Sequence, residues 1–527
     1  MATGTMQSSP ARSGPALWLL AAIAAVFGLA SVWAGITGAG GLLVGVVVAV
    51  AGTILVVRYP FLGIVIFLST FLVTYPSALR GVGNLTINNG LGMILVPMLL
   101  YGTLREGVGW FTKLRPLLWL IMAGVILITA GTLYNREIRV EGLETVELRR
   151  GAERELYGAR AQTAGALVQT RDRRVKYFTR LAFVVFFVFF VRTPQQLKVV
   201  VGVLLSVLLL TYLNVGSEAG QLGWGEGRLR VTGSGGTALY TGTNPNKLAF
   251  YALFCLTLLW YMRERIKSWV GYIPWFVSVT GAIIAIPYTA SRSGFLNLLL
   301  FSVIVLLEGR FSYRKVAGVT LVAALAVIQF GYNVNFLDVV LPSDVSGRLT
   351  QLAPVGAELL PEGQEARGSF QKRIRTLHNA FDMLSIHPLL GVGLGNYPLV
   401  RVAVSPTAAP GPPHNSYLWA ATEAGLIGLG LYLASFFWIM RQLTDILREY
   451  EGRFGPVDMR WLVHAMRTTI IVFMFFSFFA DVWAHIFFYV IIGMSLSLIR
   501  LHRTYTETGH VPGADIGGTV LIPGGAP

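Results

Sequence analysis

The sequence predicts an all-α protein that crosses a membrane many times. The composition is 54% hydrophobic and only 13% charged, and the mean hydropathy is +0.63. A water-soluble protein of 527 residues needs more polar surface than this. Several apolar runs approach the roughly 20 residues that a helix needs to cross a bilayer. We therefore expect a polytopic transmembrane helical bundle.

About fourteen segments have the hydrophobicity expected of membrane helices. The first has no convincing cleavage site and is interpreted as a span, not as a signal peptide. The expected spans are 15–36, 40–57, 60–75, 90–103, 116–134, 177–191, 199–214, 247–262, 269–288, 294–308, 315–332, 416–440, 467–480 and 484–500.

Composition also divides the chain into regions. Residues 1–332 are expected to hold the N-terminal membrane helices, with an extramembrane insert at 135–176. A long, less hydrophobic loop at 333–415 carries a predicted helix at 369–386. Residues 416–502 hold the C-terminal membrane helices. The Gly- and Pro-rich tail at 503–527 is expected to be disordered and cytoplasmic.

Basic residues predict the orientation. If the helices alternate, one side collects most of the basic clusters, and that side is expected to be the cytoplasm. Those clusters are Arg105–Arg115, Arg263–Lys267, Arg310–Lys315, Arg441–Arg467 and Arg500–Arg503. The loop 333–415 then lies outside. The net charge of +16 follows from this distribution and does not indicate a nucleic-acid partner.

The insert 135–176 disagrees with this scheme. It falls on the outer side, although it holds ten basic and seven acidic residues. Either its charges pair with one another on the outer face, or the number of early spans is wrong by one.

The predicted helix 369–386 brings basic residues into the outer loop. Ser369 can cap this helix, and Lys372, Arg373 and Arg375 occupy its first two turns. Guanidinium groups suit phosphate oxygens, although a solvated polar face explains the same residues. An apolar face is predicted from Phe370, Ile374, Leu377, Phe381 and Leu384.

Arg292 stands between two apolar segments among small residues, in the run Thr289–Gly294. A charge near the membrane interface is costly and marks a candidate functional site. The small neighbours leave room around the guanidinium and favour an anion site. The alternative is an arginine that reaches out to the lipid headgroups.

His414 precedes a membrane helix that Asn415 or Ser416 can cap. A neutral imidazole can accept a proton at neutral pH, although a single loop histidine often has no function. Two acidic residues are further candidates, because acids within membranes are rare. Glu423 lies about two turns into the same helix. Asp481 lies with His485 between the last two spans and can also cap the final helix.

Several common motifs are missing from the sequence. The run Gly391–Gly395 lacks the sixth glycine and the βαβ unit of a dinucleotide site, so a tight turn is the better interpretation. There is no P-loop, no Cys/His metal cluster and no Asp-x-Asp pair. We therefore expect no cofactor and no metal. A transferase of this type has to neutralise a diphosphate leaving group with arginine and lysine.

Four motifs in order resemble the O-antigen ligase/polymerase superfamily of membrane glycosyltransferases. They are Thr243–Asn246, Thr289–Gly294, the segment from Arg373 through His387–Gly395, and His414–Leu418 followed by Glu423–Gly428. The resemblance implies a GT-C type bundle of about twelve spans in the bacterial inner membrane, with its active site on the periplasmic side. It implies an undecaprenyl-diphosphate-linked glycan as donor and lipid A–core or another glycan as acceptor. With the fourteen segments found above, we expect about 12–14 spans.

The resemblance also implies roles for individual residues. His414 matches the catalytic histidine, and Arg292 matches an arginine that holds the donor diphosphate. Arg373 or Arg375 matches a second arginine, in the loop. Asp481 matches by position, and Asn246 and Tyr417 belong to matching motifs, so all three are expected at the substrate. The chain departs from the family in its insert 135–176 and in its number of early spans, where two of the expected segments are either half-helices or genuine additions.

Alternatives remain open at this point. A polymerase uses the same donor as a ligase and joins the glycan to another lipid-linked repeat. A transporter of lipid-linked sugars also needs basic residues in a membrane cavity, although the internal repeats typical of transporters are absent from this sequence. A non-catalytic scaffold for polysaccharide export is the third class.

Overall fold

The computed structural model describes residues 51–72, 87–106, 176–221, 245–288, 291–308, 376–385, 387–404, 413–454, 457–482 and 485–509. These residues are mostly helical, as predicted. The helices are α3 (Pro60–Leu72), α4 (Ile87–Glu106), α9 (Pro194–Gln221), α10 (Pro245–Met262), α11 (Trp269–Tyr288), α12 (Arg292–Leu307), α17 (Tyr397–Val404), α18 (Ser416–Tyr450), α19 (Arg460–Phe476) and α20 (Ile486–Thr508). Residues 51–58, 176–190 and 376–385 are also helical.

Other predicted elements lie outside the described residues. They are the spans 15–36, 116–134 and 315–332, the insert 135–176, most of the loop 333–415 and the tail beyond Gly509.

Three of the described helices are long and apolar enough to cross a membrane, at Pro194–Thr211, Ser416–Glu449 and Ile486–Thr508. Four shorter apolar helices accompany them, at Pro60–Ser69, Gly90–Leu104, Trp269–Ile283 and Ser293–Leu307. Together they support a polytopic helical membrane protein.

Several described helices extend beyond their predicted ends, α18 and α20 the furthest. α18 continues to Tyr450 and α20 to Thr508, whereas the apolar runs stop near residues 440 and 500. Hydrophobicity marks the part of a helix that lies in lipid, but a helix can continue with polar side chains. In α18 the continuation carries Arg441 and Asp445, whose charged groups lie 3.9 Å apart one turn along the helix.

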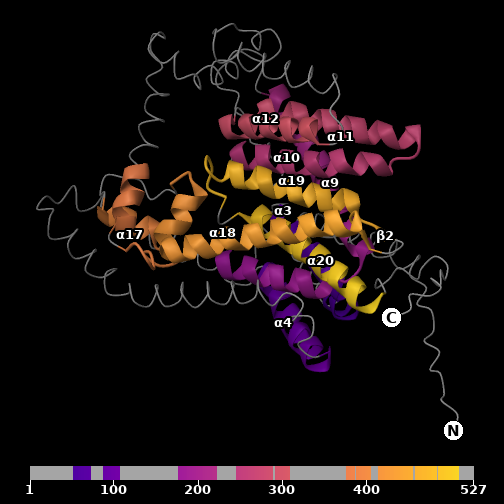
Figure 1. The fold of residues 1–527 in the computed structure, drawn as a ribbon, viewed down its shortest axis with the longest axis horizontal. Coiled ribbons are helices and arrows are strands. Elements are labelled where there is room, and N and C mark those ends of the chain that lie inside the picture. The colour runs from indigo at the N-terminus through magenta and orange to yellow at the C-terminus, as the bar shows by residue number, and fades with distance from the viewer. Residues whose placement is uncertain are drawn as a thin grey trace, which may run out of the picture.

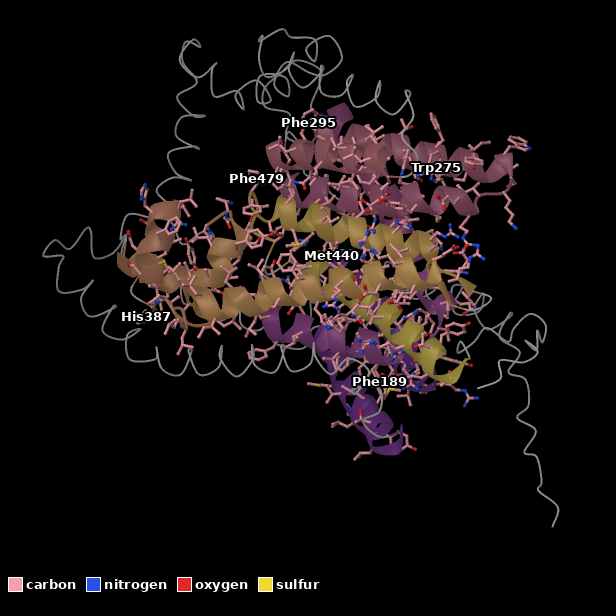
Figure 2. All side chains as sticks on the ribbon, viewed as in Figure 1. Phe189, Trp275, Phe295, His387, Met440 and Phe479 are labelled. Carbon is pink, nitrogen blue, oxygen red and sulfur yellow. The ribbon has the colours of Figure 1, made fainter. Side chains whose placement is uncertain are left out.

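The membrane helices lie side by side, with α10 between α12 and α19 (Figure 1). α17 and the neighbouring orange segment project from one end of this bundle, close to the start of α18 (Figure 1). Side chains fill the space between the helices in Figure 2, where Phe295 and Phe479 lie toward the projecting end and Trp275 lies toward the other.

An aromatic core joins α10, α19 and α20. The ring of Phe250 lies 5.5 Å from Phe473 and 5.0 Å from Phe476. Tyr251 stacks on Phe487 with ring centroids 4.7 Å apart. Such contacts add stability beyond the area they bury. They also fix which ends of these helices meet, because Phe250 and Tyr251 are near the start of α10, Phe476 ends α19, and Phe487 begins α20.

The bundle therefore has two distinct ends. We call the end where α10, α12, α18 and α20 begin the histidine end, since His414 and His485 lie there. The opposite end carries the basic residues of Arg263–Lys267, Arg441–Arg467 and Arg500–Arg503, and we call it the basic end. The described clusters predicted to share one side thus do so.

A short hairpin at the basic end was not predicted. The strands β1 (Arg453–Phe454) and β2 (Val457–Asp458) pair antiparallel between α18 and α19. Glu451 and Gly452, both with positive φ, end α18 and reverse the chain before β1. This segment is rich in charged residues, and strands of two residues are too short to be predicted from the sequence.

Candidate active site

His414 stands at the entrance of α18 in an unusual backbone conformation. Its φ of 55° lies in the left-handed region, which costs a residue other than glycine roughly 1–2 kcal/mol. Asn415 caps α18, because its side-chain oxygen accepts a hydrogen bond from the Leu418 N–H at 2.9 Å. The side chain of His414 is 42% exposed. Strain at an open polar side chain is typical of functional sites.

Ser416 has a different role from the cap that the sequence allowed. Its N–H donates to the Ser477 carbonyl at 2.8 Å. Its hydroxyl donates to the Ala480 carbonyl at 2.8 Å and accepts from the Val482 N–H at 2.9 Å. Ser416 is fully buried. These three bonds fasten the turn that contains Asp481 to the start of α18.

The carboxylate of Asp481 faces the imidazole of His414. Asp481 Oδ1 lies 3.8 Å from His414 Nδ1, which is within ion-pair distance and longer than a direct hydrogen bond. Catalytic hydrogen bonds are often long without substrate and shorten in the reacting complex. Because Nδ1 faces the carboxylate, Nε2 is the nitrogen left for a substrate. Nε2 can accept a proton while Asp481 stabilises the imidazolium that forms.

Neighbouring groups keep Asp481 ionised. Burial works to raise the pKa of this carboxyl, but the imidazole of His414 and the charge of Lys247 outweigh it and place the pKa below the ordinary value of 3.8. Asp481 is therefore negative at neutral pH and is not the group that takes up a proton. In this pair, His414 is the group that is able to take up a proton.

Arg292 is the first residue of α12, and its backbone lies at the histidine end. The preceding Ser291 caps α12, because its hydroxyl accepts from the Gly294 N–H at 3.0 Å. The same hydroxyl donates to Asn246 Oδ1 at 2.8 Å, which joins the start of α12 to the start of α10. Asn246 thus has a structural contact. The side chain of Arg292 lies outside the described residues, so the substrate contacts of both residues stay predictions.

Gly294 explains why small residues surround Arg292. A Cβ at this position would lie 2.5 Å from the Cβ of Ala249 on α10. Real Cβ atoms do not approach so closely, so a glycine is needed where α12 packs against α10. The small residue at position 294 therefore serves helix packing, and the space expected around the Arg292 guanidinium stays a prediction.

Lys247 was missed as a site residue in the sequence. It lies in the first turn of α10, directly after Asn246, and its charge acts on both Asp481 and His485. A cation in the first turn of a helix opposes the helix dipole. The unfavourable position of this charge is visible in the sequence, and it is the signal by which Lys247 can be found.

His485, and not Asp481, caps α20. Its Nδ1 accepts a hydrogen bond from the Phe487 N–H at 3.5 Å. Burial, followed by the positive charges of Lys247 and Arg180, holds the pKa of His485 well below its ordinary value. Its imidazole is therefore neutral, and Asp481 is left to face His414.

Gly425 breaks α18. Its φ of 70° and ψ of −178° belong to a region open essentially to glycine. In a continuous helix the N–H groups of Leu426 and Ile427 would bond to the carbonyls of Thr422 and Glu423. The break frees all four groups, and such groups need other partners when they are buried.

The loop before α17 supplies those partners. Val392 and Gly393 donate to the carbonyls of Thr422 and Glu423 at 2.8 and 3.0 Å. The carbonyls of Pro388 and Leu389 accept from the N–H groups of Leu426 and Ile427 at 2.8 and 3.4 Å. Two segments about 30 residues apart thus replace the missing helix bonds.

This contact requires glycine on both sides. A Cβ at Gly391 would lie 2.5 Å from the Gly425 nitrogen, and a Cβ at Gly425 would lie 1.9 Å from the Leu389 oxygen. Gly391, Gly393 and Gly395 all have positive φ. The prediction of a tight turn with close backbone packing is therefore confirmed.

Glu423 is fully buried beside this break. Its Oε2 accepts a hydrogen bond from the Tyr177 hydroxyl at 2.9 Å, which joins α18 to helix 176–190. The rare acid within the membrane region thus takes part in holding the broken helix in place.

The helix that follows Arg375 packs on its neighbours through only part of its predicted apolar face. Residues 376–385 are helical, whereas 369–375, including Arg373 and Arg375, lie outside the described residues. Ala380 and Met383 are buried in a small core, but Phe381, expected on the same apolar face, is 59% exposed. The helix approaches its neighbours through the small side chain of Ala380, which turns Phe381 outward. The core consists of Ala380, Met383, Val392, Tyr397, Leu418 and Trp419.

Tyr417 joins α18 to α19. Its hydroxyl donates to the Met474 carbonyl at 2.6 Å, and its ring lies 4.5 Å from that of Phe478. These contacts are structural, so its predicted place at the substrate stays a prediction.

The histidine end offers positive charge to an anion. The N-termini of α10, α12, α18 and α20 lie there with partial positive charges, alongside the C-termini of α9, α11 and α19. Lys247 adds a full positive charge at the start of α10. Among the described residues, no three His, Cys, Asp or Glu side chains lie together as ligands for a metal ion.

The fold and this site define a class: a helical membrane protein with a His–Asp pair and cationic groups at one end of its bundle. Residues 276–433 match the family model described as O-antigen ligase. Over this segment, the match confirms the resemblance to the O-antigen ligase superfamily. The matched segment runs from α11 into α18 and includes Arg292 and His414. No curated protein matches the chain significantly.

Proposed function

We propose that this protein is a membrane glycosyltransferase that moves a glycan from undecaprenyl diphosphate to an acceptor hydroxyl. The most favoured reaction is ligation to lipid A–core, in keeping with the description of the matched family. We place it in the bacterial inner membrane as a GT-C type bundle of about 12–14 spans, with the histidine end at the periplasm. The observation that carries this proposal is the His414–Asp481 pair, at the end where Arg292 and four helix N-termini lie.

In the proposed reaction, Nε2 of His414 takes the proton of the acceptor hydroxyl as that oxygen attacks the anomeric carbon. The bond from this carbon to the diphosphate oxygen breaks, and undecaprenyl diphosphate leaves with the electron pair. The attack inverts the anomeric configuration. Asp481 stabilises the imidazolium, while Arg292 and Arg373 or Arg375 neutralise the leaving group. Cationic side chains take the role that a metal has in other transferases, so the reaction needs none.

The test is transfer by the purified protein with a lipid-linked glycan and lipid A–core. We expect His414→Ala to reduce turnover by about 10²–10⁴-fold, the usual contribution of a general base. His464→Gln is the matched control, because His464 stacks on Tyr261 at the basic end. EDTA should leave turnover unchanged. Full turnover by His414→Ala would contradict the scheme. Loss of wild-type turnover in EDTA would contradict it as well.

A deletion strain separates ligase from polymerase. A ligase defect leaves full-length polymer on the lipid carrier, whereas a polymerase defect leaves single repeats. Movement of the donor across the membrane with no covalent product would instead identify a transporter.

A further inference from the structure

Lys247 lies close enough to Asp481 and His485 for its charge to act on both side chains. Lys247 lies one helical turn before Tyr251, on the same face of α10. Tyr251 stacks on Phe487 at 4.7 Å, and the ring of His485 lies 4.7 Å from the ring of Phe487. Lys247 is one helical turn closer to the histidine end than Tyr251. Its side chain is therefore directed toward the start of α20, where His485 lies.

His485 has a buried N–H that lacks an acceptor. The side chain is 4% exposed, and its Nδ1 is occupied as the cap of α20. Because the ring is neutral and Nδ1 accepts, the proton is on Nε2. Nε2 is buried and has no hydrogen-bond partner among the described residues. Buried polar groups without partners are rare in native proteins and call for an explanation.

The helix dipole of α10 does not favour a cation at the position of Lys247. Lys247 stands in the first turn of α10, where the helix dipole is positive. Its amine forms no ion pair with any residue in the described part of the chain. A cation and a buried N–H at the N-termini of α10 and α20 form an arrangement suited to phosphate oxygens.

We propose that Lys247 and the Nε2–H of His485 bind one phosphoryl group of the donor's diphosphate. This inference rests on the proposed function and adds two ligands for the leaving group. Before reaction, Lys247 balances the charge of Asp481. As His414 takes the acceptor's proton, its imidazolium pairs with Asp481, and the lysine becomes available to the diphosphate, which gains negative charge in the same step. The contact thus strengthens in the transition state, where it accelerates the reaction.

The experiment measures binding of undecaprenyl diphosphate to the purified full chain in detergent, together with kcat/KM for donor. We expect Lys247→Gln to weaken both by about 10–100-fold, which corresponds to a lost charge-assisted hydrogen bond. Lys247→Arg should stay within about threefold, since it keeps the charge. Lys267→Gln is the matched control, because Lys267 is exposed at the basic end.

For His485, two variants separate capping from binding. Asparagine and aspartate both cap helices well, but only asparagine can donate a hydrogen bond to phosphate. His485→Asp should weaken binding by about 10-fold or more relative to His485→Asn. Melting temperatures identify any variant that fails to fold. If neither His485 variant folds, the inference is tested by the Lys247 variants.

Competing lipids identify the ligand, since phospholipid headgroups also carry phosphate. Undecaprenyl monophosphate should displace the diphosphate weakly, and phosphatidylglycerol should not displace it. Displacement by phosphatidylglycerol at equal concentration would indicate a headgroup site and overturn the inference. If wild type binds and transfers normally and the Lys247→Gln and His485→Asp variants do the same, the inference fails while the proposed function stands. If wild type neither binds the diphosphate nor transfers a glycan, both fail.

Discussion

The two ends of the bundle use their charged residues in opposite ways. At the basic end, cations have partners within the protein. Arg467 lies 3.2 Å from Glu308, and Arg500 donates to the carbonyls of Val188 and Val191 at the end of helix 176–190. At the histidine end, helix N-termini meet and Lys247 forms no ion pair with a described residue.

Helix polarity accounts for part of the difference. Helix 176–190, α10, α18 and α20 end in carbonyls at the basic end, and these carbonyls favour cations, although α9, α11 and α19 begin there. Arginines there complete the fold, and α20 is regular up to Gly509. The histidine end holds the left-handed His414 and the break at Gly425, whereas the left-handed Glu451 and Gly452 at the basic end form the turn that ends α18. A cation that forms no ion pair with any described residue, close to strained backbone, indicates a site prepared for a ligand.

The largest effect is expected for Asp481→Asn. Asparagine keeps the shape but removes the charge that stabilises the protonated His414, so kcat should fall by about 10²–10⁴-fold. Steady-state transfer kinetics measure this loss. A fall of less than threefold would mean that Asp481 does not assist the histidine.

Asp481 also predicts a dependence of stability on pH. Its pKa in the folded protein lies below the ordinary value of 3.8, so its ionised form favours folding. This contribution is complete above about pH 5 and is lost as the pH falls through the folded value. The melting temperature of wild type should therefore fall more steeply than that of Asp481→Asn between about pH 5 and pH 3. Parallel curves would contradict the lowered pKa.

Gly425→Ala is expected to disrupt the histidine end. The added Cβ would lie 1.9 Å from the Leu389 oxygen, and the φ of 70° disfavours alanine. We expect a loss of about 3 kcal/mol or more. Gly430→Ala in the same helix is the control, because nothing lies within 4 Å of its Cβ. It should be neutral or stabilise by up to about 1 kcal/mol. Thermal unfolding in detergent compares the two variants, and equal melting temperatures would be inconsistent with the docked loop.

Arg467→Gln tests the basic end. The pair with Glu308 is about three-quarters buried on both sides, and its loss should cost about 1–2 kcal/mol. Transfer activity at a temperature where the variant stays folded should not change. A specific loss of kcat with unchanged stability would remove the distinction between the two ends.

The smallest effect is expected for Arg265→Gln. Arg265 lies 2.7 Å from Asp458, but 41% and 36% of these side chains are exposed. Exposed ion pairs contribute about 0–1 kcal/mol and are weakened by salt. A double-mutant cycle with Asp458→Asn at low and high salt measures the coupling energy. A coupling above about 2 kcal/mol would mean that this hairpin holds the basic end together.

The sequence by itself determined the parts that depend on local chemistry. Hydrophobic runs placed the described helices, because lipid leaves a chain few alternatives to helix. Asn415 was a predicted cap, and the glycines before Asn396 were a predicted tight turn. His414 and Arg292 were singled out from their neighbours in the chain, and both lie at the same end of the bundle.

Only the tertiary structure decided which distant groups meet. The loop at Pro388–Gly393 fills the break in α18 because four backbone groups there need partners, and no local pattern shows where partners come from. The place of Lys247 beside Asp481 and His485 depends on how α10 packs against α20. Phe381 faces outward because Ala380 makes the close contact. Periodicity defines the faces of a helix, but packing between helices decides which face is buried.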